Sequence, residues 1–383
     1  MKTTMISLSM VISFGALHSY ASTCGDAKSA KTVADCVRLG DCLRGNGDSP
    51  AAISAYRLGL VKSPAGSRDL YLGLALAYLD QGRWQSQMEA IQAAHRLDPA
   101  DPETLYWLGI TYELAQDWEP ALENFRKAIA ARPNDNRAHR NIGFVLLRMG
   151  EPNAAIGPLE TAIAIAPNDW KAHLNLASAY TQAPEALRNE LHQISSRGGH
   201  VVSPHEQEMM DKLKTVDYAG KSLEHARRAA ELRPDDAIAW HGLGNSLIRH
   251  AKYREAIDAL RHADSIEPGR YEIVYDLAYA QKMNRQPQEA LESCRRIEGR
   301  GRRDKQLQVL MGDVNATQRD DEAAETHYRA AIALDPQDWE VRVALARALR
   351  RMNRAPEAEK EIAAAKEMNP KLVQVIEGFY ANK

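Results

Sequence analysis

The sequence predicts an all-α fold, a solenoid of about nine helix hairpins, and three observations predict it. Prolines recur 34 residues apart, at Pro99, Pro133 and Pro167 and again at Pro234 and Pro268. If that proline is numbered 32 in each repeat, position 8 is always glycine or alanine, and position 20 is nearly always small. Position 7 is always large and apolar. Position 8 holds Gly40, Ala75, Gly109, Gly143, Ala177, Gly244, Ala278, Gly312 and Ala346.

Small residues at positions 8 and 20 let the two helices of a hairpin cross closely, and the large residue at position 7 fills the space beside them. The proline ends the second helix because it has no N–H to continue it. Gly82 and Gly150 fall between the helices, where a left-handed backbone is needed. One hairpin cannot bury its apolar face alone, so the repeats must stack on one another.

The first 21 residues are interpreted as a signal peptide. They contain Lys2, an apolar run and then Ser19-Tyr20-Ala21, which places small residues where signal peptidase requires them. We therefore expect export, and a periplasmic location. A lipid anchor at Cys24, which would make an outer-membrane lipoprotein, is the alternative, although Thr23 departs from the usual sequence before a lipidated cysteine. Residues 22–32 form a lead-in to the first repeat.

Four cysteines follow the signal peptide. Cys36 and Cys42 lie six residues apart on one expected helix, a rise of about 9 Å, which is too far for a disulfide. Cys24 can reach Cys36 or Cys42, and in an oxidising compartment we expect it to bond to one of them. Cys294 occupies an apolar position and is expected to be a buried thiol.

The repeats are expected to fill residues 33–372. The fifth departs from the pattern, because its first helix, expected over Trp170–Thr181, is followed by residues 183–216 without the small-residue signature. We interpret these as a 33-residue insertion, with a degenerate extra repeat as the alternative. Residues 373–383 are expected to form a short capping helix. The other repeats are Val33–Gly66, Arg68–Asp101, Pro102–Asp135, Asn136–Asp169, Ala237–Arg270, Tyr271–Asp304, Lys305–Asp338 and Trp339–Leu372.

These residues make the chain resemble the tetratricopeptide repeat family over Val33–Leu372. The resemblance implies a right-handed superhelix in which the first helices line a concave groove that holds partner peptides. Carried over position by position, it implies that the groove includes Arg137, Arg140, Phe144, Arg148, Lys171, His241, Asn245, Arg249, Tyr275 and Tyr279. In no repeat do Lys and Asn stand at the two positions where the family's carboxylate clamp requires them, so that partner is not expected.

No catalytic residue, metal site or cofactor site is predicted. His205-Glu206 begins like a zinc-protease helix, but Met209 stands where the second histidine is needed. The sequence has no glycine-rich phosphate loop and no nucleophile elbow. Its net charge is −2, which argues against general nucleic-acid binding.

The sequence therefore predicts a non-enzymatic scaffold or assembly factor of the cell envelope that binds peptide segments of partner proteins. It predicts no bound nucleic acid and no membrane span in the mature chain, and leaves the oligomeric state open. The alternative is an accessory subunit of an envelope polysaccharide or cytochrome-maturation machine, with a ligand-binding role for the insertion.

Overall fold

The computed structural model describes residues 24–25, 27–195, 202–301 and 304–369. The expected signal peptide and capping helix lie outside this part of the chain. The described residues form helices joined by short turns, without strands, and divide into two compact units, Met1–Pro133 and Asn134–Lys383. The prediction of an all-α stack of helix hairpins is confirmed for the described residues.

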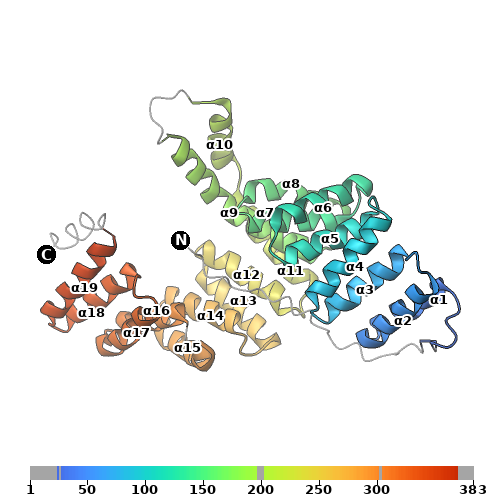
Figure 1. Ribbon diagram of the computed structural model, residues 1–383. Helices are drawn as coiled ribbons and strands as arrows, with labels where there is room; N and C mark the ends of the chain where they lie inside the picture. The colour runs from blue at the N-terminus through green and yellow to red at the C-terminus, as the bar shows by residue number, and fades with distance from the viewer. Residues whose placement is uncertain (1–23, 26, 196–201, 302–303, 370–383) are drawn as a thin grey trace. The chain divides into compact units, whose positions relative to one another are not determined.

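The first unit contains three hairpins, in which each helix packs against the next (Figure 1). Its helices are α1 (Val33–Gly45), α2 (Ser49–Lys62), α3 (Arg68–Asp80), α4 (Trp84–Leu97), α5 (Pro102–Leu114) and α6 (Trp118–Ala131).

The second unit contains six hairpins and one additional helix, α10. Its helices are α7 (Asn136–Arg148), α8 (Pro152–Ile165), α9 (Trp170–Ser195), α10 (Pro204–Thr215), α11 (Tyr218–Leu232), α12 (Ala237–Arg249), α13 (Tyr253–Ile266), α14 (Tyr271–Met283), α15 (Pro287–Gly301), α16 (Lys305–Thr317), α17 (Asp321–Leu334), α18 (Trp339–Arg351) and α19 (Ala355–Met368).

At Gly109 and Gly143, both at position 8, the two helices of the hairpin approach too closely for any larger residue. A Cβ added at Gly143 would lie 2.3 Å from Leu159 Cγ, and one at Gly109 would lie 2.7 Å from the ring of Phe125. Leu159 and Phe125 are fully buried. The predicted helix contact at position 8 is therefore confirmed, because real Cβ atoms do not approach carbon atoms this closely.

The fifth hairpin contains additional residues, and those at 183–195 and 204–215 form helix. Its first helix, α9, was expected to end near Thr181 but continues to Ser195 with Pro184 inside it. Ala183 and Leu187 on either side of the proline are buried, and this packing holds the helix together where one backbone hydrogen bond is missing. The second helix of the hairpin is α11, which packs along α9, while α10 contacts α9 more lightly.

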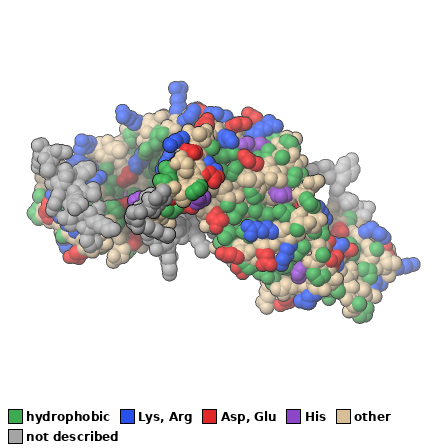
Figure 2. Space-filling model, turned by 90° about the horizontal axis from the view of Figure 1, so that it is seen from above, with side chains coloured by type: hydrophobic (Ala, Val, Ile, Leu, Met, Phe, Trp, Pro, Cys, Tyr) green, Lys and Arg blue, Asp and Glu red, His purple; other side chains and the backbone are tan. Residues whose placement is uncertain are grey.

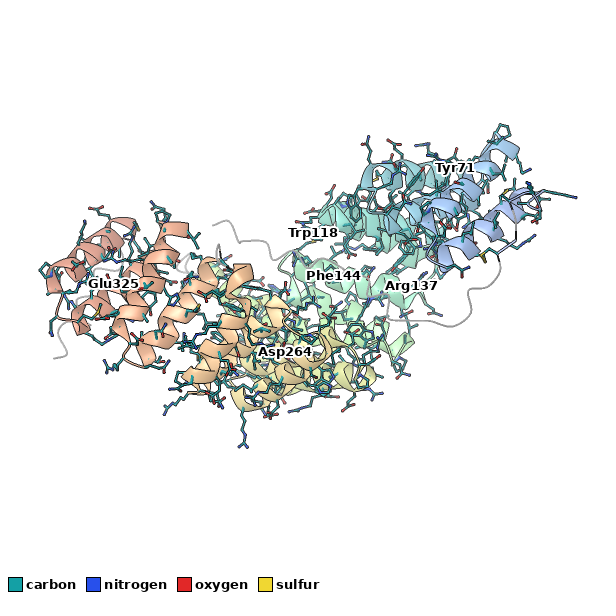
Figure 3. All side chains as sticks on the ribbon, turned by 90° about the horizontal axis from the view of Figure 1, so that it is seen from below. Tyr71, Trp118, Arg137, Phe144, Asp264 and Glu325 are labelled. Carbon is teal, nitrogen blue, oxygen red and sulfur yellow. A yellow bond between two sulfur atoms is a disulfide. The ribbon has the colours of Figure 1, made fainter. Side chains whose placement is uncertain are left out.

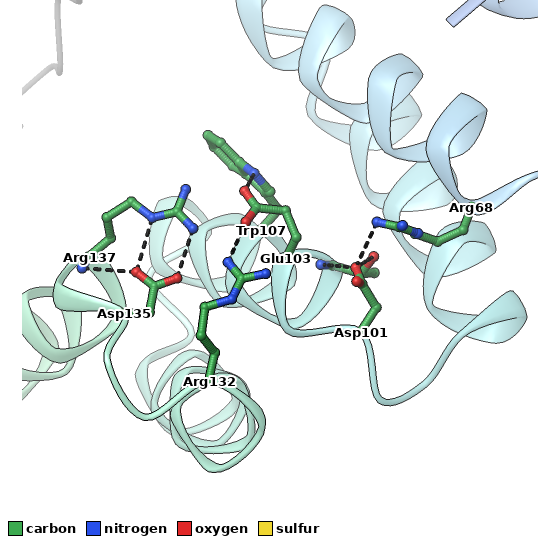
Figure 4. Close-up of polar contacts among 8 residues, drawn as sticks. Arg68, Asp101, Glu103, Trp107, Arg132, Asp135 and Arg137 are labelled. Carbon is green, nitrogen blue, oxygen red and sulfur yellow. Dashed lines mark hydrogen bonds and ion pairs between the residues drawn. The ribbon is translucent and has the colours of Figure 1, made fainter. Parts of the chain in front are cut away.

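We call the first helix of each hairpin its inner helix and the second its outer helix. In several hairpins the first residue of the inner helix donates a side-chain hydrogen bond to the aspartate that caps the inner helix of the next hairpin. Asp101 accepts the backbone N–H of Thr104 and, at 3.3 Å, a hydrogen bond from Arg68 (Figure 4). The contact recurs with the same spacing of 33 residues and a different donor each time. The other donor and aspartate pairs are Asn136 with Asp169, Tyr271 with Asp304, and Lys305 with Asp338. Each such aspartate therefore caps its own helix and binds the preceding repeat.

The lead-in is attached to the first hairpin by a disulfide. Of the two pairings that the sequence left open, the structure has Cys24 bonded to Cys42. Cys36 is a free buried thiol, and so is Cys294, as expected. The bond closes a loop with a sequence separation of 18 residues.

Candidate protein-binding face

Four inner helices of the second unit, α7, α9, α12 and α14, carry the ten residues expected to line a groove. Each packs against the next, from α7 to α9, α12 and α14. We call these ten residues together the inner face. Figure 3 shows two of them, Arg137 and Phe144, on α7.

Two of the three α7 arginines are already engaged by carboxylates. Arg137 donates from Nε and Nη2 to Asp135, at 3.0 and 2.8 Å (Figure 4). Arg140 Nη1 lies 2.7 Å from Asp169, and both aspartates are buried to more than nine-tenths. The basic cluster that the sequence suggested on α7 is therefore largely neutralised within the chain. Phe144 is half-buried and Arg148 is exposed.

The cations of the next two helices differ from those of α7. Lys171 and Arg249 are exposed, and neither has a carboxylate within ion-pair distance among the described residues. The Lys171 ammonium instead lies 5.5 Å from the ring centre of Trp170. These two positive charges are the ones that the inner face leaves available to a partner.

His241 and Asn245 are the next polar residues of the inner face, and both lie on α12. His241 Nε2 lies 2.7 Å from Asp276 on α14, and the side-chain nitrogen of Asn245 lies 3.3 Å from the same Nε2. The contact with Asp276 joins α12 to α14. The His241 side chain is only 16 % exposed, so its role in joining the helices leaves little of it for a ligand.

The last helix of the inner face is aromatic. Tyr275 stacks on Tyr271 with ring centres 6.2 Å apart, and both Tyr275 and Tyr279 are half-buried. Burial raises the pKa of Tyr275 well above that of a free phenol. At neutral pH this helix therefore presents uncharged aromatic surface, which can pack against apolar side chains.

A pocket of about 410 Å³ lies outside the inner face, between the first turn of α8 and the extension of α9. Its polar lining consists of the amides of Asn153, Asn189 and Gln193 and the carboxylates of Glu151 and Glu190. Sequence reasoning did not find it, because it depends on how far α9 extends. The lining has no aromatic or cationic side chain to orient a ligand.

The described side chains include no group of three His, Cys, Asp or Glu residues that could hold a metal ion. Acidic and basic side chains are interspersed over the face that Figure 2 displays. In the described part of the chain, no helix combines the length and apolar character needed to cross a membrane.

Tetratricopeptide repeat models match residues 317–375, residues 37–102 and 241–306, and residues 102–135, which together span more than half of the chain. No curated protein matched the sequence.

The fold is similar to that of several solved proteins. A tetratricopeptide repeat protein from Parabacteroides merdae is 15 % identical with a TM-score of 0.50, over 74 % of this chain and 98 % of that one. A monomeric IFIT1 mutant solved with m7Gppp-AAAA is 13 % identical with a TM-score of 0.51, over 88 % and 72 %. PilF of Pseudomonas aeruginosa is 19 % identical with a TM-score of 0.46, over 65 % and 97 %. At these identities the likeness concerns the fold.

Proposed function

Because this chain belongs to the tetratricopeptide repeat family, we propose that it is a non-enzymatic scaffold or assembly factor of the cell envelope that holds a segment of a partner protein on the inner face. Family membership supports the role of an interaction scaffold. The inner face supports the peptide-binding part, since the four helices that carry its charged and aromatic side chains pack one against the next. A preformed surface of this kind lowers the cost of ordering a flexible partner.

The observation that carries the proposal is the pair of available cations, Lys171 and Arg249. Lys171 lies at the start of α9 and Arg249 at the end of α12, the next inner helix. The two helices run in the same direction. A Cβ added at Gly242, early in α12, would meet the side chain of Leu174, early in α9, and further along both helices Thr181 and Ser246 are hydrogen-bonded to the same Ser222 hydroxyl. A partner that contacts both cations therefore spans roughly 20 Å, the length of a 13-residue helix, or about six extended residues.

The partner that fits is an acidic segment with an aromatic or aliphatic anchor. Its carboxylates would meet Lys171 and Arg249, and its anchor would pack on Tyr275 and Tyr279. Arg137 and Arg140 would contribute less, because a partner carboxylate would compete with Asp135 and Asp169 for them.

The test is crosslinking and pull-down from native envelopes with a double variant, Lys171→Glu and Arg249→Glu. Both side chains are exposed and neither has a described ion pair, so we expect the fold to survive. The matched control is Arg261→Glu on α13, an outer helix, where an exposed arginine likewise has no described carboxylate partner. Loss of specific partners from the double variant, with the control unchanged, supports the proposal. An unchanged partner set in the double variant refutes it.

Variants of Arg137 or Arg140 are poorer tests. Asp135 caps α7 by accepting the N–H of Arg137, and Asp169 caps α9 by accepting the N–H of Ala172. Reversing either arginine's charge would place a carboxylate beside the capping one and disturb the helix start. A lost partner would then report damage to the fold as readily as a lost contact.

A second candidate function, that of a ligand-binding accessory subunit in a polysaccharide or cytochrome-maturation machine, is favoured by the pocket beside α9. Substituting Asn153 and Asn189 by alanine should abolish such a role and leave partner capture on the inner face intact. If capture is lost and the variant is folded, the insertion belongs to the protein-binding surface instead.

The envelope location is proposed from the expected signal peptide and is supported by the disulfide between Cys24 and Cys42, since such bonds persist in oxidising compartments. N-terminal sequencing of the protein recovered from a periplasmic fraction tests it. We expect the mature chain to begin at Ser22. Recovery of the full-length chain in the cytoplasm would refute export.

A further inference from the structure

Two histidines face each other between the helices of the fifth hairpin. His173 on α9 and His225 on α11 have their Nδ1 atoms 3.0 Å apart. His173 is 6 % exposed, and His225 is half-buried. This distance is that of a hydrogen bond, which requires one Nδ1 to carry a proton and the other to be bare.

A third contact determines which nitrogen carries the proton. His173 Nε2 lies 3.1 Å from the carbonyl oxygen of Pro167, which can only accept a hydrogen bond. His173 therefore carries its proton on Nε2 when it is neutral, and its Nδ1 is the acceptor. It follows that His225 donates from Nδ1, and that its own Nε2 is the position open to a first additional proton.

The contact between His173 and His225 joins the two helices of a hairpin, and we call it the His173–His225 joint. Other hairpins are joined at the same positions by different residues. Gln308 and His327 are 19 residues apart in sequence and are bonded at 2.9 Å, and Arg342 and Glu361, also 19 apart, form an ion pair at 2.7 Å. His173 and His225 are 52 apart, which exceeds 19 by the 33 residues of the insertion. His173 and His225 therefore occupy the same two repeat positions as the other pairs. Of these three joints, only the His173–His225 joint has two side chains that can each take up a proton and become positively charged.

The other charged and titratable groups around His173 and His225 would not offset the repulsion between two protonated imidazoles. From α8, Glu160 accepts a hydrogen bond from Tyr180, whose ring on α9 stacks on His225 at 6.0 Å. From α11, the Glu224 carboxylate favours and the Lys221 ammonium disfavours a charge on His225. The carboxylates can stabilise one imidazolium, but they supply no acceptor for His225 Nδ1 once His173 is also protonated.

We propose that the His173–His225 joint takes up one additional proton but not two, so that acidification loosens the hairpin of α9 and α11. The first proton goes to His225 Nε2 and leaves the hydrogen bond intact. A second proton, on His173 Nδ1, would remove the acceptor and place two cations about 3 Å apart. The unfolded chain has no such restriction and binds both protons.

The environment of His225 also predicts that the folded hairpin loses stability as the pH falls. Burial, and next the repulsion that a proton on His173 would exert, lower the pKa of His225 below its usual value of 6.5. A histidine whose pKa is lowered by folding contributes stability above the pKa of the unfolded chain, and that stability is lost as pH falls below about 6.5. The hairpin is therefore expected to weaken between pH 7 and pH 5.

The test is amide hydrogen exchange of α9 and α11 as a function of pH, corrected for the intrinsic exchange rate. If one proton is excluded from the folded joint and the unfolded pKa is about 6.5, the opening constant rises about 30-fold from pH 7.5 to pH 5. His173→Gln reproduces the joint of Gln308 and His327, so the variant should fold, and its opening constant should rise only a few-fold. The matched control is His262→Gln on α13, which should retain the wild-type dependence.

An equal pH dependence in wild type and His173→Gln would overturn the proposal, as would a pH-independent opening constant in wild type. A second measurement does not depend on any variant. Nitrogen chemical shifts of the wild-type imidazoles should show a proton on His173 Nε2 and on His225 Nδ1 at pH 7.5. Between pH 7.5 and 5 the pair should take up one proton, and uptake of two with α9 and α11 still protected would also overturn the proposal.

Discussion

Replacing Asp169 by alanine removes three interactions at once. One carboxylate oxygen accepts the N–H of Ala172 and caps α9, and the other accepts hydrogen bonds from Asn136 at 3.0 Å and from Arg140 at 2.7 Å. The Asp169 side chain is 8 % exposed and that of Arg140 is 19 % exposed, so water replaces these contacts only in part.

We expect Asp169→Ala to lower the free energy of unfolding by about 2.5–4 kcal/mol. Losing an N-cap costs about 1 kcal/mol. Losing a hydrogen bond to a charged group, with Arg140 left largely desolvated, adds about 1.5–3 kcal/mol. Asp169→Asn keeps an acceptor at the helix start but loses the charge, so it should cost about 1 kcal/mol less than alanine does.

The assay is urea unfolding followed by circular dichroism, together with hydrogen exchange of α9, because stacked repeats need not unfold as one unit. The control is Asp235→Ala. Asp235 also pairs with an arginine, Arg233 at 3.3 Å, but its side chain is 77 % exposed, and its loss should cost less than about 0.5 kcal/mol. If Asp169→Ala and Asp235→Ala lower the free energy of unfolding by amounts within about 0.5 kcal/mol of each other, Asp169 does not hold neighbouring repeats together and the reasoning fails.

Three further predictions concern packing, burial and pH. Gly143→Ala would press on Leu159 and should destabilise by about 1–3 kcal/mol in urea, whereas Gly157→Ala, with no atom within 4 Å of the added Cβ, should be neutral or stabilising. Burial raises the pKa of the Cys294 thiol to about 12, so iodoacetamide at pH 8 should label it only after urea unfolding; labelling of the folded chain would contradict this. The pKa of Glu325 is lowered because hydrogen bonds from two arginines outweigh its burial, so the stability difference between wild type and Glu325→Gln should be present above pH 4.5 and disappear as pH falls further; a difference that persists at pH 2 would contradict this.

The hairpin fold was predictable because its requirement is local and repeated. Gly109 and Gly143 stand where a Cβ would meet a buried side chain, and a small residue, glycine or alanine, recurs at this position in each repeat. The length of α9 was not predictable from this pattern. Pro184 indicates a helix end by its chemistry, and only burial of its neighbours in the folded chain keeps the helix continuous.

The ion pairs of the inner face could not be predicted from the sequence. The sequence places Arg140 on an inner helix, but its carboxylate partner is 29 residues away, and that pairing depends on how successive repeats stack. His173 and His225 are 52 residues apart, a separation that includes the 33-residue insertion, so sequence spacing alone gave no sign of their contact. A search for equivalent repeat positions after removal of the insertion could have found it.

The shared capping aspartates also bear on how such a chain can change over time. The acceptor at this joint is an aspartate in each case, while its donor is Arg68, Asn136, Tyr271 or Lys305. Because four different side chains can donate this hydrogen bond, the contact requires a donor of suitable length but tolerates wide variation in the identity of that residue. A repeat copied to a new place beside such an aspartate would find a compatible neighbour, and this gives duplication an easy route to a longer chain.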